Sequence, residues 1–243
     1  MHAIETRDLT RRFGALTAVD RLNLTVEEGE LFALLGVNGA GKTTAIRMLC
    51  GLLTPTSGDA LICGKSVVRE TAAVKQLIGV SPQETAVGLH LTVRENLRLM
   101  AGLQGLDKAQ RREKTEEMLA RLHLDQVADQ RAKTLSGGWM RRLSIAMALI
   151  SQPRVLFLDE PTLGLDVLIR LELWSVIRAL KGRTTVILTT HYLEEAQALS
   201  DRIGILAHGR LTRLGTAEEL MAAAGTGSFE EAFVALVGEE AAQ

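Results

Sequence analysis

The stretch GELFALLGVNGAGKTT, residues 29–44, determines the fold of this chain. It opens on an unbroken apolar run at 31–35, which is the pattern of a strand buried on both faces. The loop after it, GVNGAGKT at 36–43, matches the phosphate-binding pattern G-x-x-x-x-G-K-[ST]. An amphipathic segment follows, with Ile46, Leu49, Cys50 and Leu53 on one face, and predicts a helix that the run TPTSG ends. A strand, a phosphate loop and a helix in this order predict an α/β protein.

The residue types of this loop suit phosphate chemistry. Gly36, Gly39 and Gly41 have no Cβ, so the backbone N–H groups around them can fold closely onto phosphate oxygens. Lys42 is expected to reach the terminal phosphates of a nucleotide, and Thr43 to present its hydroxyl to Mg²⁺. A glycine-rich turn could arise by chance, but the strand before it and the helix after it favour the functional interpretation.

The remaining strand and helix patterns surround this unit. Alternating residues in IETRDL (4–9) and RLNLTV (21–26) predict half-buried antiparallel strands. Residues from about 90 to 152 have helical periodicity, so we expect a helical insertion between 86 and 152 in a mostly parallel sheet. Further strands are expected in ALICG (60–64), LIGVSPQ (77–83), RVLFLDE (154–160), TTVILTTH (184–191) and RIGILAHGRL (202–211), and helices at 166–181 and 192–200.

Composition and charge exclude several classes of protein. The chain has 243 residues, 47% of them hydrophobic, with a formal net charge of −1 and two cysteines, Cys50 and Cys63, that lack metal-ligand spacing. We interpret the arginine pairs at 11–12, 111–112 and 141–142 as solvated faces, so no nucleic-acid partner is expected. No apolar run approaches the roughly 20 residues that span a bilayer, and the charged N-terminus does not match a signal peptide. These features predict a cytoplasmic protein.

Three further positions carry potential chemistry. Asp159 ends an apolar strand, where it can hold Mg²⁺, and Glu160 follows it, where it can polarise a water molecule. His191 also ends an apolar strand, a place where a lone histidine is more commonly structural than catalytic. Taken alone, Gln83 and Phe13 are weak signals of a site, because Gln83 is compatible with an ordinary surface position and Phe13 with a core position.

The segment TLSGGWMRRLSIAMALI, 134–150, predicts an unusual helix. Apolar residues recur at helical spacing from Met140, yet the helix begins at Ser136, Gly137 and Gly138, which leave its free N–H groups almost uncovered. Such a helix end favours anions, because the unpaired donors and the helix dipole both attract negative charge.

Together these motifs resemble the nucleotide-binding domain of ABC transporters over essentially the whole chain. The resemblance implies a P-loop NTPase of the ABC ATPase type, with no guanine-reading N-K-x-D motif. It further implies one domain over 1–243, with a nucleotide-binding core at about 1–85 and 153–220, a helical signature subdomain at about 86–152, and a short tail at about 221–243. The motifs are the phosphate loop 36–43, Gln83, LSGG at 135–138, FLDEPT at 157–162, GLD at 164–166 and His191.

The resemblance also implies residue roles and two cofactors, ATP and Mg²⁺. Phe13 resembles the aromatic residue that stacks on adenine, Glu160 the catalytic base and His191 the switch at the γ-phosphate. Thr43, Gln83 and Asp159 are the expected Mg²⁺ ligands. The expected ATP contacts are Phe13, Gly36, Val37, Asn38, Gly39, Ala40, Gly41, Lys42, Thr43 and Thr44.

Members of this family form head-to-tail dimers with ATP between the subunits. The resemblance implies that Ser136, Gly137 and Gly138 contact the ATP of the other chain, with glycine required because a Cβ would hold that ATP away. Asp166 belongs to the loop that crosses to the other subunit. The implied partners are a second ATPase subunit, identical or different, and an integral membrane permease near Gln83. The subunit is thereby expected at the inner face of the cell membrane.

Two residues depart from the family pattern, and alternatives remain open. Trp139 stands where glutamine or methionine is common, and Leu163 where serine or asparagine is common. A soluble ABC ATPase without transport function and a degenerate nucleotide-binding regulator are the alternatives. The segments at 91–106 and 209–240 resemble exporter ATPases of the daunorubicin-resistance and sodium-efflux type, and the sequence ends before any sugar-importer regulatory domain. We therefore expect an export subunit.

Overall fold

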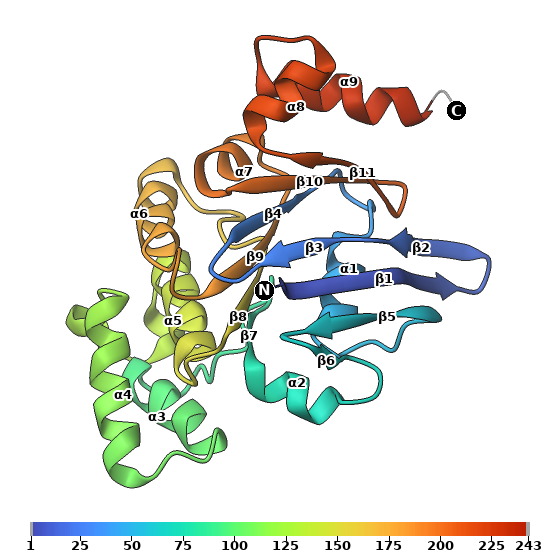
Figure 1. Ribbon diagram of the computed structural model, residues 1–243. Coiled ribbons are helices and arrows are strands. Elements are labelled where there is room, and N and C mark those ends of the chain that lie inside the picture. Colours follow the sequence, from blue (N-terminus) through green and yellow to red (C-terminus); the bar gives the residue numbers. More distant parts are fainter. Residues whose placement is uncertain (1, 242–243) are drawn as a thin grey trace.

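A six-stranded sheet forms the centre of the molecule, in the order β11-β10-β4-β9-β8-β7. The computed structural model describes residues 2–241 (Figure 1). All neighbouring pairs are parallel except β10 and β11, which form an antiparallel hairpin. The strands are β4 (Leu31–Leu35), β7 (Ile78–Ser81), β8 (Val155–Asp159), β9 (Thr185–Thr190), β10 (Arg202–Ala207) and β11 (Arg210–Gly215). The predicted, mostly parallel core is confirmed.

A second, antiparallel sheet is built on the long strand β1. Helix α1 (Lys42–Leu49) lies between the two sheets, and a continuous apolar core joins them, with Phe32 and Phe157 from the central sheet and Ile4 from β1. The strands of this sheet are β1 (His2–Phe13), β2 (Leu16–Leu22), β3 (Thr25–Glu27), β5 (Ser57–Ile62) and β6 (Lys65–Ser66). Because α1 ends at Leu49, Leu53 lies beyond the helix and not on its face as predicted.

The prediction of one continuous strand over 21–26 is wrong. The segment is divided between β2, which ends at Leu22, and β3, which begins at Thr25, and Arg21 near the end of β2 has a φ of +46°, outside the extended region. The break is stabilised by Asn23, whose side chain accepts from the Asp8 N–H (2.9 Å) and donates to the Asp8 carboxylate (2.8 Å). Leu22, Leu24 and Val26 are nevertheless buried, because both short strands pair with β1.

Helices cover the other face of the central sheet (Figure 1). Between β7 and β8 lie α3 (Val93–Leu103), α4 (Lys108–Arg121), two short 3-10 turns (Asp125–Val127 and Ala132–Thr134) and α5 (Gly137–Leu149); α6 (Val167–Arg178) and α7 (Leu193–Leu199) follow β8 and β9. Capping boxes start α3 and α4, with Thr92 and Glu95 at one and Asp107 and Gln110 at the other. The sequence patterns missed α2 (Thr71–Leu77), which precedes β7.

The two arginines of α5 are not on a solvated face, contrary to the prediction for the pair at 141–142. Arg141 and Arg142 are 6% and 7% exposed. Helix α5 packs against α3, α4 and α6 as well as β7 and β8, so almost its whole circumference is enclosed. By contrast, Arg111 and Arg112 on α4 are exposed as expected.

The C-terminal region consists of α8 (Ala217–Ala224) and α9 (Phe229–Ala241), which pack on β10, β11 and α7. Helix α8 begins inside the range predicted for the core, and the last two residues of the predicted tail lie outside the described residues. No single helix within 2–241 has the length and apolarity to cross a bilayer; 217–224 and 229–238 meet those criteria only as a pair, bent by 61°. Phe229, Ala232 and Leu236 of α9 are buried in the core.

Candidate active site

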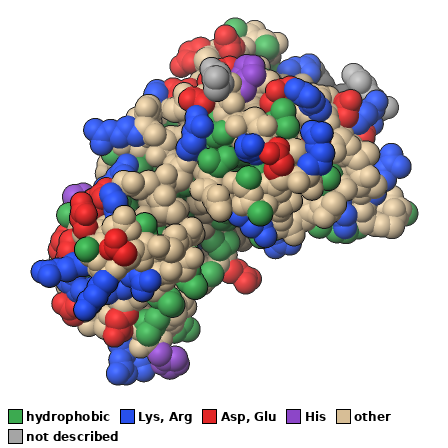
Figure 2. Space-filling model, turned by 60° about the horizontal axis from the view of Figure 1, so that its bottom comes forward, with side chains coloured by type: hydrophobic (Ala, Val, Ile, Leu, Met, Phe, Trp, Pro, Cys, Tyr) green, Lys and Arg blue, Asp and Glu red, His purple; other side chains and the backbone are tan. Residues whose placement is uncertain are grey.

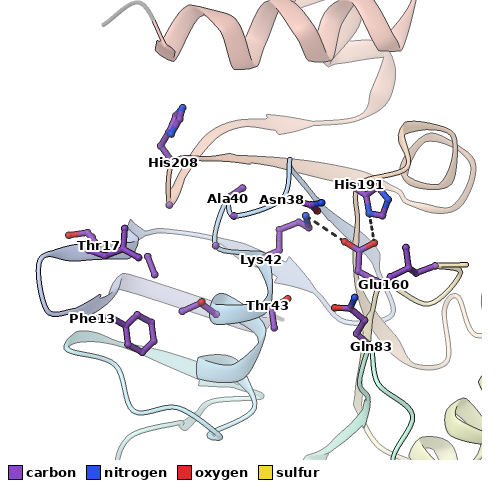
Figure 3. A pocket seen from close by; sticks show the side chains of 17 residues that line it. Phe13, Thr17, Asn38, Ala40, Lys42, Thr43, Gln83, Glu160, His191 and His208 are labelled. Atoms are coloured by element: carbon purple, nitrogen blue, oxygen red, sulfur yellow. Dashed lines mark hydrogen bonds and ion pairs between the residues drawn. The ribbon is translucent and has the colours of Figure 1, made fainter.

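Residues from five separate loops converge at the carboxyl ends of the parallel strands (Figure 3). Lys42 follows β4, Gln83 follows β7, Glu160 follows β8, His191 follows β9 and His208 follows β10. Ligands of open α/β sheets bind at this edge, because the loops after parallel strands all open there. The resulting cavity has a volume of about 620 Å³. It is lined by Phe13, Leu16, Thr17, Ala18, Asn38–Thr44, Gln83, Glu160, Leu163, His191, His208 and Gly209.

The phosphate loop is packed tightly at two of its three glycines, Gly36 and Gly41. A Cβ on Gly36 would lie 2.4 Å from the Leu206 carbonyl oxygen. Gly41 has a φ of +106°, and a Cβ there would lie 2.4 Å from the Ala18 carbonyl oxygen. Because Gly41 precedes the first turn of α1, the free N–H groups of that turn open into the cavity, which is an arrangement suited to phosphate.

The ammonium group of Lys42 lies at the centre of the cavity. It donates to the carbonyl oxygens of Gly36 (2.7 Å) and Val37 (3.3 Å) in its own loop. Its Nζ is also 3.5 Å from Oε1 of Glu160, and both side chains are buried. A single positive charge is thus held between the phosphate loop and an acidic side chain.

Glu160 is fixed in an unusual conformation. Its φ is +48°, in the left-handed region that side chains other than glycine rarely adopt. Its N–H donates to the carbonyl oxygen and the hydroxyl of Thr189, both at 3.1 Å. The carboxylate lies between Lys42 and His191, whose Nδ1 is 2.8 Å from Oε2 (Figure 3). Strained residues of this kind concentrate at functional sites, where the surroundings hold them in place.

Hard oxygen donors suited to Mg²⁺ lie beside the phosphate loop. The Thr43 hydroxyl donates to Oδ1 of Asp159 at 3.4 Å, and the Thr189 hydroxyl donates to the same oxygen at 2.5 Å. The Gln83 side chain lines the same cavity. Mg²⁺ is commonly held by one or two carboxylates together with substrate phosphates, so this small donor set fits it.

The opposite end of the cavity is formed by Phe13 and two segments that sequence analysis missed. Phe13 is 45% exposed, and the Arg11 guanidinium lies over its ring, 4.5 Å from the centroid. The missed segments are 16–18, the start of β2, and the β10–β11 turn at 208–209. The Gly209 N–H donates to the Ala40 carbonyl (3.0 Å), which joins this turn to the phosphate loop. His208 and Gly209 both have positive φ (+49° and +80°), as a two-residue hairpin turn of this kind requires, but only the strand order brings the turn to the site.

Comparison with known proteins identifies the fold. Residues 19–163, more than half of the chain, match the ABC transporter family. The chain belongs to the ABC transporter family. It is an ATP-binding ABC subunit with the ATPase fold that the motifs predicted.

Relatives and solved structures agree with this assignment. The daunorubicin/doxorubicin resistance ATP-binding protein DrrA of Streptomyces peucetius is 44% identical over 92% of this chain and 68% of its own length. The probable multidrug ABC transporter ATP-binding protein YbhF of Escherichia coli is 39% identical over 96% of this chain, which spans only 41% of that relative. An ATP-binding subunit of an ABC transporter superposes with a TM-score of 0.86 at 29% identity, covering 96% of this chain and 99% of its own. A dimeric ATP-binding cassette bound to ADP and Pi has a TM-score of 0.79 at 26% identity, covering 88% and 98%.

The ABC signature residues lie outside the cavity of their own chain. Ser136 is the exposed N-cap of α5, its side chain makes no capping bond, and a Cβ on Gly137 would lie 3.6 Å from Leu165. Asp166 caps α6, where its carboxylate accepts from the Ile169 N–H (3.1 Å). The signature and the loop at 163–166 are therefore neighbours within one subunit, and of this loop Leu163 lines the nucleotide cavity whereas Asp166 does not.

Packing within the subunit requires glycine at position 138, which the sequence did not reveal. A Cβ at this position would lie 2.5 Å from Cγ2 of Ile169 on α6. The expectation that glycine is needed only to admit the partner's ATP is therefore incomplete for Gly138, since helix packing within the ABC subunit already requires it. Gly137 has no such close contact.

We expect Gly138→Ala to destabilise the nucleotide-free subunit by about 1–3 kcal/mol, the usual cost of overpacking. Urea unfolding measures this effect, and Gly137→Ala, whose new Cβ would make only an ordinary contact with Leu165, is the matched control. Adding Ile169→Ala to Gly138→Ala should restore most of the lost stability. Equal stability of the Gly138 and Gly137 variants would contradict this packing argument.

The two departures from the family pattern have distinct surroundings. Trp139 is partly buried, with the Arg142 guanidinium 5.0 Å from its ring centroid, and Arg142 forms an ion pair with Glu172 of α6. Trp139 therefore packs where α5 meets α6. Leu163 lines the nucleotide cavity, with 37% of its surface exposed.

Proposed function

We propose that this ABC subunit binds Mg·ATP in the cavity at the strand ends and hydrolyses it with Glu160 as general base. The observation that carries this proposal is the buried Glu160 carboxylate, held between Lys42 (3.5 Å) and His191 (2.8 Å). A carboxylate fixed in this way can orient a water molecule and accept its proton as the water attacks the γ-phosphate. His191, on the far side of the carboxylate, positions it and faces the same phosphate.

The remaining cavity residues bind and orient the nucleotide. Backbone N–H groups of the part of the phosphate loop that lines the cavity, 38–44, surround the phosphates, and Lys42 exchanges its bonds with its own loop for bonds with the terminal phosphates. Thr43, Asp159 and Gln83 would hold Mg²⁺, which supplies charge neutralisation on the phosphates when bound. Phe13, exposed at the opposite end, offers an apolar ring face on which adenine stacks.

The second part of the proposal is a head-to-tail dimer. The N-terminus of α5 has exposed, uncapped N–H groups at Ser136 and Gly137, which is a site for negative charge. We assign this helix end, with Gly138, to the γ-phosphate of ATP held by a second subunit, and Asp166 to the loop that crosses to it. Two identical chains, or this chain and a homologous one, fit the same arrangement.

The third part is transport through a membrane permease. One relative is named for daunorubicin/doxorubicin resistance and another as a probable multidrug ABC transporter protein, which supports an export role on the cytoplasmic side of the membrane. Beside Gln83 a hollow of about 260 Å³ opens between β7, α3 and α5. Nearby on α3, the side chains of Leu99 and Leu103 are 51% and 72% exposed. Hydrophobic side chains lie along the boundary between the helical region that contains α3 and α4 and the rest of the molecule (Figure 2). This surface is suited to an apolar segment of the permease.

We expect Leu99→Glu and Leu103→Glu to weaken binding of the purified subunit to inverted membrane vesicles of the source cell by about tenfold or more. An unpaired charge at an apolar interface is costly to bury, whereas both positions are exposed in the free subunit. Cosedimentation measures binding, and ATPase activity without vesicles should remain within about twofold, as expected of exposed substitutions. Val234→Glu on α9, which is 69% exposed, is the control. Unchanged binding of both α3 variants would show that the coupling surface lies elsewhere.

A further inference from the structure

Arg141 is a buried cation in the second turn of α5, and its hydrogen bonds cross to two loops of the active site. Its Nη1 donates to the Pro82 carbonyl at 2.7 Å, and its Nη2 donates to the Gln83 carbonyl at 2.9 Å. Nη2 also lies 3.4 Å from the Glu160 carbonyl. One guanidinium group therefore connects the loop after β7, the loop after β8 and the helix that begins at the signature.

Burying the charged guanidinium of Arg141 costs solvation free energy, which its hydrogen bonds must offset. Burial lowers the pKa of its guanidinium, while the carboxylates of Asp159 and Glu195 act in the opposite direction. The three hydrogen bonds all go to backbone carbonyl oxygens, so the side chain is not simply half of a salt bridge. A rigid, planar donor group suits this task, because it can satisfy several carbonyls at fixed angles.

The contact with Glu160 acts on a strained residue. The φ of Glu160 is +48°, and such a conformation persists only where the surrounding structure holds the backbone in place. Thr189 holds the Glu160 N–H, whereas the carbonyl accepts from the Leu163 N–H (3.2 Å) and from Arg141. Gln83 is restrained in the same way, because its carbonyl accepts from Arg141. The side chain of Gln83 lines the cavity.

We infer that Arg141 is a positioning residue that fixes Glu160 and the Gln83 loop relative to the signature helix. This inference rests on the proposed role of Glu160 as base. Movement of α5 is thereby transmitted to the carbonyl of Glu160 and to the loop that bears Gln83. In the proposed dimer, the N-terminus of α5 serves the partner's ATP while Arg141 of the same helix serves the site in its own chain. The side chain therefore links the two ATP sites.

The test compares Arg141→Met and Arg141→Lys with Arg112→Met, an exposed arginine of α4, as control. Methionine retains bulk without any donor, so kcat should fall by about 10- to 100-fold, the effect of a small misplacement of a catalytic group. KM and the dissociation constant for ATP should stay within about threefold, because no proposed phosphate contact is removed. Lysine retains a donor for one or two carbonyls, and its kcat should lie between those of Arg141→Met and the unmodified chain. Hydrogen exchange should accelerate in peptides that contain 82–85 and 160–163.

The outcomes separate this inference from the proposed function. If the unmodified chain hydrolyses no ATP, the proposed function is wrong, and hydrogen exchange decides separately on Arg141: unchanged exchange at 82–85 and 160–163 in Arg141→Met would overturn the positioning role. Arg141→Met with unchanged kcat, or with ATP affinity lost in parallel with kcat, would overturn the positioning role. If Arg141→Met does not fold, Arg141→Lys decides: reduced kcat at unchanged KM supports the role, and unchanged kcat with unchanged hydrogen exchange overturns it.

Discussion

Lys42→Ala should abolish tight ATP binding and lower ATP turnover by at least about 10²–10³-fold, the scale expected when a preorganised charge contact is removed. The ammonium group is the positive charge held at the centre of the cavity, within 3.5 Å of Glu160. Its removal leaves the phosphates without this countercharge. It also leaves the carbonyl of Gly36 without the Lys42 donor, whereas the Val37 carbonyl still accepts from the Ala40 N–H (3.1 Å), so only a modest loss of stability accompanies the loss of function.

A nucleotide-binding titration and a steady-state ATPase assay measure this effect, with thermal unfolding to show that the variant is folded. Lys108→Ala on the first turn of α4 is the control, since that lysine lies outside the cavity. ATPase activity close to that of the unmodified subunit would refute the assignment of the phosphate site.

Glu160→Gln should retain ATP binding and slow hydrolysis by about 10²–10⁴-fold, the usual contribution of a general base. Glutamine has nearly the same shape, so the backbone bonds to Thr189 and the contact with His191 can persist. What is lost is the ability to accept a proton from water. Single-turnover hydrolysis measures the effect, and Glu194→Gln, whose side chain is 73% exposed on α7, is the control. A Glu160→Gln variant that hydrolyses ATP within about threefold of the normal rate would exclude Glu160 as the base.

The sequence predicted those parts of the molecule that depend on local pattern. The apolar run at 31–35 is a fully buried central strand, and the loop after it has the close backbone packing that its glycines suggested. Asp159 and His191 follow apolar strands, and the parallel sheet brings such strand ends to one edge. The family resemblance supplied the roles, which local patterns alone left open for Phe13 and Gln83.

The parts that were missed depend on contacts between distant segments. Arg141 reads as a polar residue on an amphipathic helix, yet α5 is enclosed by neighbours that bury its polar side as well. The sequence pattern predicts that Gly138 leaves room for a ligand. Its contact with Ile169 depends instead on the crossing of α5 and α6. The break between β2 and β3 depends on Asn23 meeting Asp8 across the sheet. Periodicity within one segment contains no information about these partners.

In the proposed dimer, ATP is enclosed between two subunits, with Ser136 of one chain facing the ATP of the other. The size of Glu160→Gln in solution, measured by sedimentation velocity with and without Mg·ATP, tests it most directly. We predict a monomer without nucleotide or with Mg·ADP, and a dimer with Mg·ATP. Adding Ser136→Arg, a change at an exposed helix end, should return the protein to a monomer that still binds ATP. A Glu160→Gln subunit that is saturated with Mg·ATP and remains monomeric would contradict the account.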